Sequence, residues 1–221
     1  MPPAPAFNPQ HSTTPCAASI DDLRFRNLIS DAAWERLPHP VRRRFSKRVA
    51  GGGSVVYVGE ITEASRNLAG RCLAEVLRLI GAPLPLSAAT GLPSVVSVTE
   101  DRSGGGQNWT RIQGTTNGFP QVVHSAKRFS GPTGLEEYLS KHISMALRIE
   151  AEARSLVFRS DHIAFHIGGR RLRLPRLLSP GELTVRHREI GAGRFSFSMT
   201  LVHPLLGQLI HQSGIYREER Q

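Results

Sequence analysis

The sequence predicts an α+β domain in which N-terminal helices pack on a strongly curved antiparallel β-sheet. Apolar residues repeat every three to four positions in parts of the first third of the chain, whereas from Ser94 onward they alternate with a period of two. Glycine-rich turns separate the later segments, and no helical pattern intervenes, as expected for consecutive antiparallel strands. A sheet of so many strands usually curls or closes to hide its edges, which predicts a barrel-like shape around a pocket.

Residues 1–19 are expected to be a disordered leader. They are rich in Pro, Ala, Ser and Thr and lack the apolar core behind a basic start that marks a secretory signal. One domain is predicted over 20–219, with a helical part at 20–90 and an antiparallel sheet part at 93–217.

The segment 20–48 is predicted to be helical. Asp21 and Asp22 favour a helix N-terminus, while Pro38 and Pro40 interrupt the helical pattern. Its apolar positions are Leu23, Leu28, Trp34 and Leu37.

Two further elements are predicted before residue 90. Residues 54–61 contain four consecutive residues of high strand propensity, Val-Val-Tyr-Val, and read as a strand. Residues 67–80 show helical spacing and end before Gly81 and Pro83. Cys72 lies within this helix and Cys16 within the leader, so we expect no structural disulfide and a reducing, cytoplasmic location.

The remaining strands are predicted from alternation and turn residues, at 94–99, 107–112, 121–129, 142–150, 154–160, 162–167, 181–190, 195–203 and 208–216. Met145 and Leu147 share one strand face, as do Phe197 and Met199. These four side chains are expected to line the concave side of the sheet.

The net charge of +10 suggests an acidic partner, but its distribution argues against a nucleic-acid site. Of the 28 basic residues only Lys47, Lys127 and Lys141 are lysines, so arginine is enriched along the whole chain. The one dense cluster is Arg42–Arg48, which fits phosphate contacts or, better, a solvated helix end. No helix-turn-helix, zinc-finger or RNA-binding signature accompanies it, and no apolar run reaches the length needed for membrane insertion.

Established catalytic and cofactor motifs are not found in the sequence. It contains no Gly-x-Ser-x-Gly, no Gly-x-Gly-x-x-Gly and no Gly-Lys-Ser/Thr. His162 and His166 would stand about 13 Å apart on a strand, too far to share one ion. His187 and Glu189 share a face and are interpreted as a structural pair. We therefore expect no metal and no cofactor.

Several short motifs occur in a fixed order. They are Trp109-Thr-Arg111, Leu135-Glu-Glu137, Leu174-Pro175 with Pro180, Gly193-Arg-Phe195-Ser-Phe197 and Pro204-Leu205-Leu-Gly207 with Gly214. This ordered set resembles the bacterial domain of unknown function family 4166, and with the helical opening the likeness covers 23–216. The resemblance implies a domain that occurs alone or attached to Rossmann-type oxidoreductases similar to saccharopine dehydrogenase. Gln113 departs from the family's pattern, which has an aromatic residue shortly after Trp-x-Arg.

A candidate site follows from these residues. Trp109 and Arg111 lie two apart on one strand and so face the same side. A buried Arg needs an acceptor, and the resemblance places Glu137 alongside it. His124 and His142 complete the polar set.

We interpret the domain as binding a small, largely apolar molecule in the curved sheet. Arg111 would fix a carboxylate or enolate oxygen, and Glu137 or His124 would move a proton in a cofactor-free proton transfer or cyclisation. The ligand would be bound by Trp109, by His142 and by the inward side chains of Met145, Leu147, Phe197 and Met199. An Arg–Glu pair that only fixes sheet register is the competing interpretation, so the sequence leaves open whether the domain is an enzyme.

The second functional hypothesis is a non-catalytic accessory domain that docks onto a separate oxidoreductase. A closed apolar cavity would favour ligand binding, and a solid core with an exposed apolar patch would favour docking.

Overall fold

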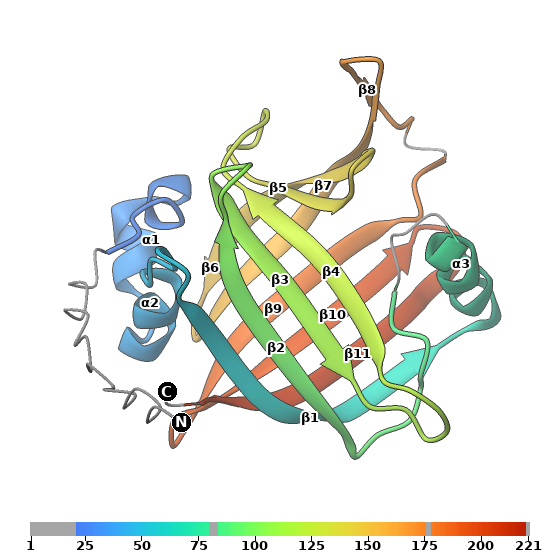
Figure 1. Ribbon diagram of the computed structural model, residues 1–221, viewed down its shortest axis with the longest axis horizontal. Helices are drawn as coiled ribbons and strands as arrows, with labels where there is room; N and C mark the ends of the chain where they lie inside the picture. The colour runs from blue at the N-terminus through green and yellow to red at the C-terminus, as the bar shows by residue number, and fades with distance from the viewer. Residues whose placement is uncertain (1–20, 80–83, 176–177, 220–221) are drawn as a thin grey trace, which may run out of the picture.

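The computed structural model describes residues 21–79, 84–175 and 178–219, and it shows a closed antiparallel barrel (Figure 1). Ten strands follow one another around the barrel in chain order, and β11 closes it against β1. β8 pairs with β7 alone and lies outside the ring. The strands are β1 (Ser54–Arg66), β2 (Leu92–Asp101), β3 (Gly106–Gln113), β4 (Gln121–Arg128), β5 (Glu136–Ser140), β6 (Ile143–Glu152), β7 (Ser155–Ile167), β8 (Arg170–Arg173), β9 (Glu182–Gly191), β10 (Arg194–His203) and β11 (Gly207–Glu218).

The predicted N-terminal helical region contains only short helices. They are η1 (Arg26–Leu28), α1 (Asp31–Glu35) and α2 (His39–Phe45). The Ser30 side chain caps α1 by accepting from the amide of Ala33 at 3.3 Å. Pro38 is the N-cap of α2, and Pro40 lies in its first turn. The prolines therefore separate α1 from α2 and also mark the start of α2.

These helices cover one end of the barrel (Figure 1). Their buried side chains form a single apolar cluster with strand residues from the barrel wall. The cluster includes Phe25, Trp34, Val41, Phe45, Leu147 and Phe158. Phe25 packs edge-on against Phe45, with ring centroids 5.3 Å apart. The cluster packs the helices onto the barrel wall.

Helix α3 (Leu68–Leu79) lies outside the barrel against β11 (Figure 1). Its buried residues are Gly70 and Ala74, and Ala69 and Leu73 pack partly buried beside them. A Cβ on Gly70 would lie 2.0 Å from the carbonyl oxygen of Leu209, so the close approach requires glycine. The predicted helix is confirmed; Gly81, Pro83 and the leader lie outside the described residues. In the described part of the chain, no helix is long and apolar enough to cross a membrane.

Every strand predicted for the sheet occurs in the structure, but two observed strands were not predicted and two predicted strands form one. β5 and β8 were not predicted. The segments 154–160 and 162–167 form one strand, β7, whose register against β6 shifts between Ala146 and Leu147. β1 comes from the part assigned to helices, and it is the strand that closes the ring.

Candidate functional site

The barrel interior contains a cavity whose walls are largely apolar. About 80 Å³ is open there to the centres of water molecules. The apolar lining includes Val96, Met145, Leu183, Val185, Phe197 and Met199. Arg111, Gln113, Ser125, Glu137, Gln212 and Tyr216 supply polar groups to the same wall. Strand alternation explains this set, because every second residue of β3, β4, β5 and β11 points inward.

Glu137 is the centre of a buried ionic cluster. Its Oε1 lies 3.0 Å from Lys127 Nζ and 3.5 Å from Arg111 Nη2. The hydroxyl of Ser125 donates to the same oxygen at 2.7 Å and accepts from Arg111 Nη1 at 3.2 Å. Arg111 and Glu137 therefore form the pair that the sequence analysis expected, with Lys127 as an additional cation.

The cluster holds more positive than negative groups. Burial alone would raise the pKa of Glu137, but the nearby Lys127 and Arg111 outweigh it and lower that pKa to about 2. Burial lowers the pKa of Lys127, and Glu137 opposes this shift only in part. The Glu137 carboxylate is thus ionised at neutral pH, and the two cations share this one negative charge.

Aromatic rings surround the two cations. Lys127 Nζ lies 4.8 Å from the centroid of the Trp109 ring, and the Arg111 guanidinium carbon lies 5.9 Å from both Trp109 and Phe197. Faces of aromatic rings attract cations, so these contacts compensate part of the lost hydration. Trp109 is therefore a wall beside Arg111, as its strand position predicted.

Two hydrogen-bonded pairs form the polar part of the cavity wall. Gln113 Nε2 donates to Gln212 Oε1 at 2.8 Å, and the Tyr216 hydroxyl donates to Ser94 Oγ at 2.9 Å. Both pairs are buried, so each group is matched without water. Gln113, the departure from the family pattern, thus holds a cross-barrel contact.

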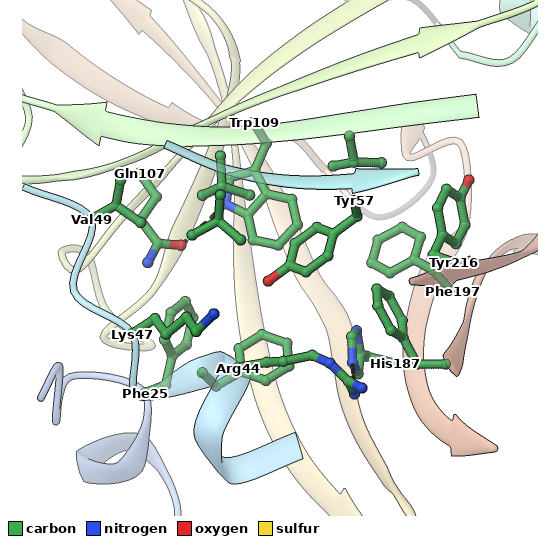
Figure 2. A pocket seen from close by; sticks show the side chains of 15 residues that line it. Phe25, Arg44, Lys47, Val49, Tyr57, Gln107, Trp109, His187, Phe197 and Tyr216 are labelled. Atoms are coloured by element: carbon green, nitrogen blue, oxygen red, sulfur yellow. Dashed lines mark hydrogen bonds between the residues drawn. The ribbon is translucent and has the colours of Figure 1, made fainter. Parts of the chain in front are cut away.

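A smaller hollow lies under helix α2 (Figure 2). About 30 Å³ is open there to water centres, between Tyr57, Arg44 and Lys47. Arg44 contacts Glu189 at 2.8 Å and His187 Nε2 at 3.2 Å. Burial, and secondarily Arg44, lowers the pKa of His187 to about 3, so this ring is neutral.

Arg44 corrects one prediction. The sequence pattern of Arg42–Arg48 favours a solvated helix end or a phosphate site, but Arg44 is 8% exposed and its guanidinium stacks 4.3 Å above the centroid of the Phe195 ring. Helix α2 places the Arg44 side chain at this end of the barrel, where it contacts His187 and Glu189. Arg42, by contrast, forms a surface ion pair with Glu35.

Two predicted site residues, His124 and His142, have exposed side chains, although His124 also borders the cavity. His124 is exposed and its Nδ1 lies 3.1 Å from Thr110 Oγ1, because alternation turns both side chains to the outer face. His142 is exposed in the turn before β6, 3.2 Å from the carbonyl oxygen of His166. Leu147 is buried in the cluster beneath the N-terminal helices, whereas Met145, Phe197 and Met199 border the cavity.

The barrel wall is weakest between β4 and β5. These strands pair only from Ala126 to Arg128 on β4, opposite Glu136 to Tyr138 on β5. An open groove on the outer face follows the unpaired part, and His124, Ser125 and Leu139 border both this groove and the inner cavity.

Sequence reasoning missed Lys127, Ser125 and Gln212. Ser125 and Lys127 lie two residues apart on β4 and so share one face, and this spacing could have indicated that both point inward. Their meeting with Glu137 depends on β5, which was not predicted. Within the described residues, no group of three or more His, Cys, Asp or Glu side chains could hold a metal ion.

Comparison with known proteins gives a matching family model and a solved structure of low similarity. The family model described as "Domain of unknown function (DUF4166)" matches residues 37–215. No curated protein matches the chain. Among solved structures, a mutant of the fluorescent protein UnaG is 14% identical, with a TM-score of 0.31 over 75% of this chain and 95% of that chain.

Proposed function

The chain belongs to the DUF4166 family, and we propose that its barrel binds a small, largely apolar molecule that carries one acidic group. The observation that supports this most directly is the position of Arg111. Its guanidinium borders an apolar cavity, and its closest carboxylate, Glu137, is already bound by Ser125 and Lys127. A guanidinium has five N–H donors, so Arg111 has donors left for an incoming carboxylate.

Charge balance supports an anionic ligand. Buried charges are costly unless they are paired, and the cluster of Arg111, Lys127 and Glu137 has one cation more than it has carboxylates. A carboxylate bound at Arg111 would complete the second ion pair. A neutral ligand would leave the imbalance in place.

The cavity sets the size of the ligand. Since one water needs about 10–15 Å³ of such space, the open volume of about 80 Å³ corresponds to roughly six water-sized groups. Met145 and Met199 border it, and methionine side chains adjust easily to irregular shapes. A short apolar chain or ring with one carboxylate fits this description. The gap between β4 and β5 is the proposed access route.

We favour binding over catalysis. A pKa of about 2 keeps Glu137 ionised and tied to two cations, so it is a poor proton donor at neutral pH. His124, the other proposed proton carrier, lies on the outer face. Docking onto a Rossmann-type oxidoreductase, a cytoplasmic location and a single domain over 20–219 stay predictions.

Calorimetric titration tests the proposal. The probes are hexanoate, octanoate and decanoate, each compared with the primary alcohol of the same chain length. We expect the acids to bind better than the alcohols, and Arg111→Gln to weaken acid binding by roughly 10- to 100-fold, the value of a charge-assisted hydrogen bond. The alcohols should bind the variant and the parent equally.

A matched control is Arg148→Gln. Arg148 pairs with Asp161 at 2.8 Å, but its side chain is 65% exposed, so its loss should leave carboxylate binding unchanged. Equal affinity for acids and alcohols, or equal losses in the two variants, would refute the assignment of Arg111.

A further inference from the structure

Helix α3 presents an apolar stripe to solvent. Leu68 is 77% exposed, Val76 56% and Leu79 81%. At 3.6 residues per turn these three side chains lie within an arc of roughly 80° on the helix surface, opposite Gly70 and Ala74, which face β11. Exposed Cys72 falls inside the same arc. The stripe is thus the outer face of an amphipathic helix whose inner face is already packed.

A second apolar segment lies beside the start of this helix. In the turn between β10 and β11, Leu205 is 87% exposed and Leu206 54%. Asn67, directly before α3, donates its side-chain amide to the carbonyl oxygen of Leu206 at 3.0 Å. Its backbone amide donates to the carbonyl oxygen of Leu209 at 3.1 Å. The helix and the turn therefore form one apolar surface, which we call the α3 face (Leu68–Leu79 with Leu205 and Leu206).

Positive charge flanks the α3 face. Arg71 and Arg78 are exposed and lie together on one side of the leucine stripe, and Arg66 ends β1 just before the helix. Glu75, which pairs with Arg78 at 3.0 Å, is the one acidic residue of α3. Long Arg side chains can place their apolar stems against buried surface and their charges among anionic groups.

We propose that the α3 face docks on anionic lipid membranes. A helix with leucines on one face and arginines at its flank matches the boundary between acyl chains and acidic headgroups. The face consists of an exposed helix surface and an exposed turn, so its apolar side chains can enter a fluid layer. A second copy of this chain would bring like charges together in a two-fold contact between molecules of net charge +10. The proposal is independent of the cavity and its ligand.

Co-sedimentation with vesicles tests the proposal on the full chain. One vesicle set is pure phosphatidylcholine and the other contains equal parts phosphatidylcholine and phosphatidylglycerol. The charges of Arg66, Arg71, Arg78 and Glu75 sum to +2. Each basic residue near an anionic surface contributes about 1 kcal/mol, so this charge predicts roughly 30-fold tighter binding to the anionic vesicles. High salt should remove most of this preference.

Three variants and a control separate the apolar from the charged contribution. Leu79→Asn and Leu205→Asn should each weaken binding to anionic vesicles by about tenfold, because each removes one exposed leucine from the inserted surface. Arg71→Glu with Arg78→Glu should reduce binding to the level seen with pure phosphatidylcholine. Leu172→Asn on β8, where the leucine is 51% exposed, is the matched control and should bind as the parent does.

Thermal melts of each variant establish that the fold is kept. Equal binding to both vesicle sets, or the same loss with Leu172→Asn as with Leu79→Asn, would overturn the proposal. So would a dimer in sedimentation velocity that Leu79→Asn dissolves while no vesicle binds, because that result assigns the α3 face to a second copy.

Discussion

Replacing Glu137 with Gln removes the one carboxylate of the buried cluster while keeping its size. The pKa of Glu137 falls from its ordinary 4.5 to about 2 in the folded protein. At 1.36 kcal/mol per pKa unit, this shift corresponds to roughly 3 kcal/mol of folding stability at neutral pH. Removing one partner of a buried ion pair costs about 3–5 kcal/mol, which agrees. We expect the lower value, because Lys127 can lose its proton once the carboxylate is gone.

The pH dependence gives the same prediction a second test. The folded-state pKa of Glu137 lies below the unfolded one, so its contribution is present above pH 4.5 and is lost as the pH falls toward 2. Glutamine mimics the protonated acid. The difference between the parent and Glu137→Gln should therefore shrink from roughly 3 kcal/mol at pH 7 to roughly 1 kcal/mol at pH 3.

Urea unfolding of both proteins across this pH range is the assay. Glu150→Gln is the control, because Glu150 pairs with Arg159 at 2.9 Å but is 48% exposed; its loss should cost less than about 1 kcal/mol. A cost below about 1 kcal/mol for Glu137→Gln, or a cost that does not change with pH, would mean that the Glu137 carboxylate does not stabilise the fold through Lys127 and Arg111.

Three further predictions concern the frame around the site. Gly70→Val should lower the urea midpoint by displacing α3, since its side chain would meet the carbonyl oxygen of Leu209; an unchanged midpoint would mean that the helix is not held there. Tyr216→Phe should cost about 1 kcal/mol in the same assay, through loss of the buried bond to Ser94, and a neutral variant would contradict this. The ring of His187, with a pKa of about 3, should show no titration by NMR between about pH 8 and pH 4, and an inflection in that range would contradict its burial.

The inward rows of the barrel could be predicted from alternation alone. Trp109 with Arg111, and Phe197 with Met199, lie on the same sides that their two-residue spacing indicated. β5 escaped because Glu136, Glu137 and Tyr138 give no apolar alternation, although the two glutamates are buried. A strand whose inward side chain is ionised cannot be recognised from hydrophobic period.

Long-range pairing accounts for the other failures. Lys127 faces inward because a carboxylate from the next strand receives it, and Arg44 turns inward because Glu189 on β9 does the same. Glu189 is far from Arg44 in sequence, and Glu137 lies on β5, the strand that lacks an apolar pattern. His124 was misplaced for a simpler reason: it lies one residue from the inward Ser125, and a shift of one position reverses the face of a strand.

NMR titration of the barrel with hexanoate, the probe nearest the cavity in size, tests whether Arg111 holds a carboxylate. The side-chain Nε–H signal of Arg111 reports on the atom group proposed to hold the carboxylate. We expect a saturable shift of this signal, together with shifts of the Met145 and Met199 methyl groups that border the same cavity. Shifts confined to surface residues, with Arg111 and both methyl groups unmoved, would contradict this expectation.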